Sequence, residues 1–116
     1  MTDEQKKIAF EQARAQNPDR EIEAVEFTVG SREYFFVVTS PNRGEWKRYK
    51  QEIAKAAGDI DALESAIERA AIAQIRYPER DQAAKCFDIS PGIVQTFAAV
   101  LNRLAGVDSE AREKKF

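Results

Sequence analysis

The chain offers few residues that could carry out catalysis. It has 116 residues, no histidine and a single cysteine, Cys86. Without histidine there is no Ser-His or Cys-His pair to activate a nucleophile, and no imidazole to bind a metal ion. An enzyme would have to work with carboxylates, lysine or the one thiol. We therefore expect a protein without enzymatic activity and without a cofactor.

Two groups of residues could still bind a metal ion or supply a reactive thiol. Asp59, Asp61 and Glu64 are close enough in sequence to suggest metal ligands. Their spacing matches no known metal-binding loop, and acidic residues are favoured at helix N-termini, so we interpret them as capping residues. Lys85 could lower the pKa of the neighbouring Cys86. Because Cys86 lies among alanines and a phenylalanine, we interpret it as a packed side chain and predict no metal site.

The most distinctive polar segment runs from Arg43 to Lys55 and combines basic and aromatic residues. Its cations could form a solvated helix face, a surface for an acidic protein or a nucleic-acid contact. Trp46 and Tyr49 lie one helical turn apart, which suits core packing as well as the anchors of a protein interface. The candidate partner-binding residues here are Trp46, Tyr49, Arg43, Lys47 and Arg48.

The N-terminal part of the chain predicts a helix and then a β-hairpin. Thr2 and Gln5 form a capping-box pattern that begins a helix ending near Gln16. Two strands follow, over residues 22–29 and 32–39, and Gly30-Ser31 between them suits a type II′ turn.

The register of this turn places Val29 opposite Arg32, Phe27 opposite Tyr34 and Val25 opposite Phe36, so that four of these residues share a core face: Val25, Phe27, Tyr34 and Phe36. Phe35 and Val37 lie on the other face, and we find no third strand. Either the first helix or another chain must cover them, because a lone hairpin is marginal in water. Phe35 and Val37 are therefore further candidate partner-binding residues, for self-association or for another protein.

The second half of the sequence predicts helices only. Ser40-Pro41 opens one that ends at Gly58, and Asp61 with Glu64 is expected to cap a central Ala-rich helix that stops at Tyr77-Pro78. A short helix over about 78–87 and a last one opened by Ser90-Pro91 complete the set. The fold class is thus α+β, mainly helical with about five helices and one N-terminal hairpin. The expected core residues are Phe27, Phe36, Trp46, Leu63, Ile67, Phe97 and Leu101.

Length and composition limit the organisation of the chain. We expect one globular domain over residues 1–106 and a charged, mobile C-terminal tail over 107–116. The net charge of −2 does not favour nucleic acid as the main partner. No signal peptide or membrane-spanning run is recognisable, and a single cysteine fits a reducing compartment, so we expect a cytoplasmic protein.

Between about Phe27 and Gly106 the chain resembles the tail assembly chaperones of long-tailed bacteriophages. Members often have a short β-region and a proline followed by a helix with paired aromatic residues. An acidic break, an Ala/Leu-rich helix ending near a proline, and a second Pro-opened helix come next. The corresponding residues here are Ser40-Pro41, Glu45-Trp46 with Tyr49, Asp59 to Asp61, Leu63 to Ile75, Tyr77-Pro78 and Ser90-Pro91.

The resemblance implies a non-enzymatic role in the bacterial cytoplasm. Such proteins bind the tape measure protein, help to recruit tail tube subunits, and are absent from the mature virion. Self-association is expected as well, from the hairpin face that carries Phe35 and Val37. In many phages a ribosomal frameshift gives a longer form, and Lys114-Lys115 suits a slip site.

Two other functions remain open from the residues alone. One is a phage or prophage structural accessory or adaptor that binds a single defined protein partner. The other is a small nucleic-acid-binding regulator that uses the basic segment from Arg43 to Lys55.

Overall fold

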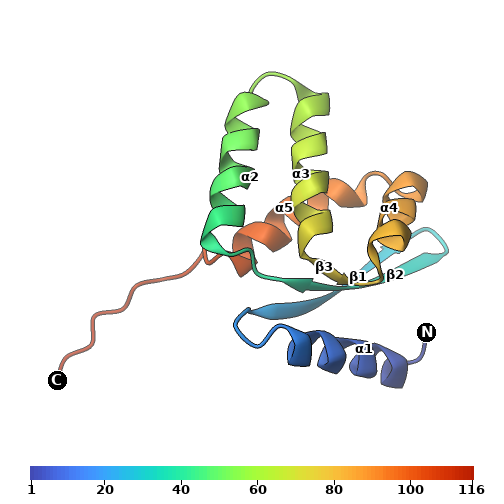
Figure 1. Ribbon diagram of the computed structural model, residues 1–116, viewed down its shortest axis with the longest axis horizontal. Helices are drawn as coiled ribbons and strands as arrows, with labels where there is room; N and C mark the ends of the chain where they lie inside the picture. The colour runs from blue at the N-terminus through green and yellow to red at the C-terminus, as the bar shows by residue number, and fades with distance from the viewer.

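A three-stranded antiparallel sheet lies at the centre of the computed structural model, which describes all 116 residues (Figure 1). The hairpin strands β1 (Ile22–Val29) and β2 (Arg32–Thr39) meet at Gly30-Ser31. Gly30 has φ +61°, whereas Ser31 does not have a positive φ, since only glycines do in this chain. A positive φ at the first central residue alone is what a type II′ turn requires. The predicted hairpin register is confirmed, including Phe27 opposite Tyr34.

The third strand, β3 (Ile75–Tyr77), was not expected from the sequence. It pairs antiparallel with β2, Val37 opposite Tyr77 and Val38 opposite Ile75, so that β2 becomes the central strand. The prediction of a lone hairpin was therefore wrong. β3 has only three residues and follows directly from a helix, so it shows neither the alternation nor the turn residues that mark a strand.

One face of the sheet packs on an aromatic core. Phe36 is fully buried, and its ring lies 5.3 Å from that of Phe97 and 6.2 Å from that of Phe87. Phe27 is half-buried and completes the cluster, 5.3 Å from Phe97. Tyr34 at the edge hydrogen-bonds through its hydroxyl to that of Ser90 at 2.8 Å. This is the core face that the hairpin register predicted.

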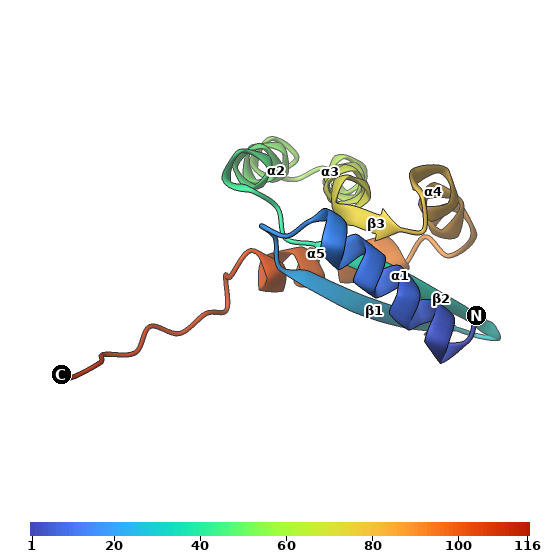
Figure 2. The same ribbon diagram turned by 60° about the horizontal axis from the view of Figure 1, so that its bottom comes forward.

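Helix α1 (Asp3–Gln16) covers the opposite face of the sheet, as Figure 2 shows. Its capping box of Thr2 and Gln5 is present as predicted, and it packs through Ala9 and Ala13. Ile8 instead faces solvent with an exposed fraction of 52%. Two small residues one turn apart let the helix lie close to the strands, which confirms that the first helix covers this face.

Helices α2 (Arg43–Lys55) and α3 (Ile60–Gln74) form an antiparallel pair that stands on the core side of the sheet (Figure 1). Their predicted caps were off by a few residues. Asn42, not Ser40, caps α2 and forms a capping box with Glu45. Asp59, not Asp61, caps α3 by accepting a hydrogen bond from the Ala62 N–H. Gly58, with φ +84°, makes the turn between the helices.

Helices α4 (Arg80–Ile89) and α5 (Ile93–Leu104) complete the fold. A turn at Pro91-Gly92 links them, and Ser90 caps the end of α4 rather than opening α5. α5 crosses behind α3 and contributes Phe97 and Leu101 to the core. The structure thus has five helices and a small sheet, and its fold class is α+β, as expected.

Most of the expected core is confirmed, but Leu63 and Trp46 are exceptions. Phe36, Ile67, Phe97 and Leu101 are buried, and Phe27 is half-buried but packs against the core cluster. Leu63 is 37% exposed, and Trp46 is half-buried outside that cluster. α2 has no buried residue. Residues 109–116 form no helix or strand and extend away from the domain (Figure 1). None of the five helices combines the length and apolarity needed to cross a membrane.

Candidate protein-binding groove between α2 and α3

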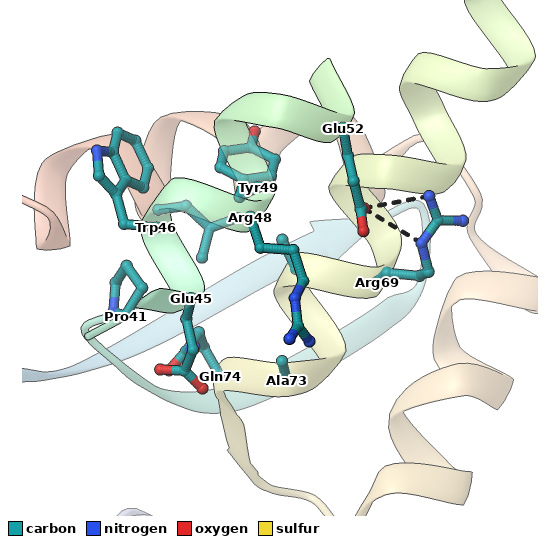
Figure 3. Close-up of a pocket in the computed structure, with 11 residues that line it drawn as sticks. Pro41, Glu45, Trp46, Arg48, Tyr49, Glu52, Arg69, Ala73 and Gln74 are labelled. Atoms are coloured by element: carbon teal, nitrogen blue, oxygen red, sulfur yellow. Dashed lines mark hydrogen bonds and ion pairs between the residues drawn. The ribbon is translucent and has the colours of Figure 1, made fainter. Parts of the chain in front are cut away.

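A groove of about 190 Å³ opens between α2 and α3 (Figure 3). No residue of α2 is fully buried, although Tyr49 and Ile53 pack against the core cluster. On the α3 side the groove is lined by the small residues Ala70 and Ala73, and Leu101 of α5 closes it from behind. Small residues on α3 leave room that larger side chains would fill.

Trp46 and Tyr49 provide the aromatic surface of this groove. Their ring centroids lie 5.6 Å apart at an interplanar angle of 48°, with both side chains half-buried. Burial raises the pKa of the Tyr49 phenol above its ordinary value. Both residues can accept apolar contact and still offer a polar N–H or O–H, as interface anchors do.

Two ion pairs fix the position of α2 around the groove. Glu52 accepts hydrogen bonds from Arg69 on α3, with the Nη2 and Nε atoms 3.2 Å and 3.3 Å from Oε2. At the other end, Arg20 donates to Glu45 at 2.8 Å and to Gln74 at 3.1 Å. Gln74 is 2% exposed and also accepts a hydrogen bond from Thr39 at 3.0 Å. These contacts join α2, α3 and the sheet.

Glu45 has a carboxyl pKa below its usual value. Burial alone would raise this pKa, but hydrogen bonds from the Asn42 backbone N–H, the Gln74 side chain and the Arg20 guanidinium outweigh that effect. Glu45 is therefore ionised at neutral pH and holds the first turn of α2 against Arg20.

Arg48 is the charged residue that the groove leaves free. It lies between the two helices, in front of Ala73 (Figure 3), and takes part in none of the ion pairs of the chain. A guanidinium in this position can pair with a carboxylate that enters the groove. The groove thus combines aromatic, apolar and cationic contacts.

The structure brings together only some of the residues predicted to bind a partner. Trp46, Tyr49 and Arg48 line the groove, whereas Arg43 and Lys47 are exposed on α2 outside it. Lys114 and Lys115 lie in the extended C-terminal segment.

Phe35 and Val37 lie on the α1 side of the sheet, far from the groove in the fold. Val37 is fully buried, and Phe35 is half-buried with its ring 5.9 Å from Tyr77 and 5.8 Å from the Lys6 ammonium. A partner could reach Val37 only if α1 moved away. Their role in association stays a prediction.

Sequence reasoning missed several groove residues. Ala70 and Ala73 lie in the helix predicted as central and Ala-rich, and nothing in their pattern indicated that they border an open space. Arg20 lies in a loop after Pro18, and no pattern in the sequence connects it with Glu45 or Gln74. The excess of alanine over larger residues in α3 was the one available signal.

Asp59 and Cys86 have surroundings that fit their interpretation as a capping residue and a packed side chain. Asp59 caps α3, and no cluster of three or more potential ligands is placed to hold a metal ion. Cys86 is half-buried, and burial raises the pKa of its thiol, which disfavours the reactive thiolate.

Comparison of the chain with protein-family models, with curated proteins and with solved structures finds no match.

Proposed function

We propose that this protein is a non-enzymatic tail assembly chaperone of a long-tailed bacteriophage. In this function it binds the tape measure protein in the host cytoplasm, helps to recruit tail tube subunits, and is not part of the mature virion. The proposal combines the resemblance of residues 27–106 to that family with the presence of a groove suited to another protein.

The observation that carries the proposal is the aromatic surface between α2 and α3. Trp46 and Tyr49 are only partly buried and line the groove side by side, and Tyr49 also packs against the core cluster. Together with arginine, these residue types dominate the binding energy of protein interfaces. A groove with these anchors favours a protein ligand over a small polar substrate.

The shape and charge of the groove indicate which kind of protein segment could bind there. Two helices with small residues between them can receive a third amphipathic helix, because its apolar side chains would contact Trp46, Tyr49 and Ala73. An acidic residue beside that apolar stripe would meet Arg48. A long protein with repeated hydrophobic patterning could present many such segments.

Co-expression tests the proposal. The tape measure protein from the same genome should stay soluble and co-purify with the wild-type chain, and both effects should be lost with Trp46→Ala combined with Tyr49→Ala. Gln95→Ala with Thr96→Ala, at exposed positions of α5, is the matched control and should behave as wild type. A tape measure protein that is equally insoluble with and without the chain would contradict the proposal.

An adaptor that binds one defined protein would use the same groove. The two functions differ in stoichiometry, because a chaperone of a long repetitive protein binds many copies per partner and an adaptor binds one. The mass of the purified complex separates them.

A further inference from the structure

The outer face of α2 carries positive charge that nothing in the chain neutralises. α2 contains five basic residues and two carboxylates, and both carboxylates are engaged, Glu45 with Arg20 and Glu52 with Arg69. None of the basic residues takes part in an ion pair. Arg43 and Lys47 are exposed at helical spacing on the side away from the groove. Lys50 lies one turn further along, and its ammonium is 6.0 Å from the centre of the Trp46 ring.

The other side of α3 has the opposite character. A second groove of about 360 Å³ lies between α3 and the end of α4, and its lining includes no lysine or arginine. It contains four carboxylates that take part in no ion pair: Asp61, Glu64, Glu68 and Asp88. Arg69, the one basic residue of α3, is held by Glu52 on the opposite side.

Apolar side chains are exposed next to this acidic groove. Ile60 precedes Asp61 and is 76% exposed, and Ile89 follows Asp88 and is 54% exposed. Large apolar residues beside uncompensated charge are typical of surfaces that are covered in an assembly.

We propose that the outer face of α2 in one molecule docks on the acidic groove of a second copy. The charges are complementary, and each face lacks a partner within its own chain, so a contact between copies would neutralise both. The proposal concerns the protein alone and does not rest on the proposed function.

The position of the two faces determines the kind of assembly. α2 and α4 lie on opposite sides of α3 (Figure 1), so one molecule can use both faces at the same time. The contact joins two different surfaces and is therefore heterologous, and it adds subunits head to tail into chains or rings.

Salt dependence of self-association is the first test. In sedimentation velocity runs the wild-type chain should form oligomers in about 50 mM salt that dissociate in about 500 mM salt, because screening weakens contacts between exposed charges. A chain that stays monomeric at low salt and high protein concentration would overturn the proposal. So would oligomers that are indifferent to salt, since these would show apolar association instead.

Two charge-reversed variants then locate the contact. Arg43→Glu with Lys47→Glu removes the basic face, and Glu64→Lys with Asp88→Lys removes the acidic one. Each variant should be monomeric alone, because it keeps only one of the two complementary faces. An equimolar mixture should assemble again, since the intact basic face of one variant meets the intact acidic face of the other and the two reversed faces are complementary as well.

A control separates local charge from net charge. Lys7→Glu with Lys115→Glu changes the net charge as much as the α2 variant does but lies outside both faces, and it should assemble like wild type. Circular dichroism melting checks that every variant is folded. The head-to-tail contact would be refuted if either charge-reversed variant alone assembled like wild type. It would also be refuted if the mixture stayed monomeric.

Discussion

At the scale of single residues, substitution of Trp46 should affect partner binding more than it affects folding. Its side chain is only partly buried and lies outside the aromatic core cluster, so Trp46→Ala should lower the free energy of unfolding by roughly 1–2 kcal/mol. Phe97→Ala, in the centre of the aromatic cluster, should lower it by about 3–5 kcal/mol. Urea denaturation measures both. A Trp46 variant as unstable as the Phe97 variant would show that Trp46 is part of the core.

Glu45 gives the protein a predictable sensitivity to acid. Its pKa is below the ordinary value of 4.5 in the folded protein, so the stability it contributes is present above about pH 4.5 and is lost as the pH falls through the folded pKa. Glu45→Gln removes the charge and should lower stability at pH 7 by roughly 0.5–1 kcal/mol.

The pH dependence of this difference is the decisive readout. Thermal melts of wild type and Glu45→Gln should converge as the pH falls below about 4.5, because the wild-type carboxyl is then protonated as well. A difference that persists unchanged at low pH would mean that the charge of Glu45 does not stabilise α2.

Individual residues also show where sequence reasoning reached its limit. Thr2 and the Gly30-Ser31 turn were predicted correctly because short-range backbone chemistry decides both. The cap of α2 was misassigned because Ser40, Pro41 and Asn42 all suit a helix start, and only the capping box between Asn42 and Glu45 distinguishes them. Contacts such as Arg20 to Gln74 join residues 54 positions apart, and no local rule reports them.

At the scale of elements, α1 is needed to cover the sheet. Ala13 is 5% exposed against the strands, so Ala13→Asp would bury a carboxylate without a partner and should lower the free energy of unfolding by about 2–3 kcal/mol. Gln12→Asp, at an exposed position one residue earlier, is the matched control and should leave it nearly unchanged. Equal stability of the two variants would mean that α1 is not held on the sheet.

The elements themselves were predictable in number and type where their pattern was long. The five helices and the hairpin follow from periodicity and turn residues, and the register follows from the turn. β3 was missed because three residues are too few to show a period. The groove was missed for a different reason: helical spacing indicates which side of α2 faces inward, but not how closely α3 approaches it.

At the scale of the whole molecule, the proposed function predicts a second gene product. Mass spectrometry of the protein expressed from its native locus should find a minor longer form that shares this N-terminus and diverges near Lys114-Lys115. Such a form is expected from the resemblance to tail assembly chaperones, because many of them arise by frameshifting. Detection of the 116-residue form alone would favour the adaptor function instead.

The most direct test of the central claim uses Trp46, the only tryptophan in the chain and a residue of the groove. We would follow its fluorescence during titration with segments of the tape measure protein, at high salt so that contacts between copies of the chain are suppressed. The account predicts a saturable blue shift, because a bound apolar segment excludes water from the indole. The assignment of this groove as the partner site would be contradicted if tape measure segments bound without changing the emission of Trp46. It would also be contradicted if they did not bind at all.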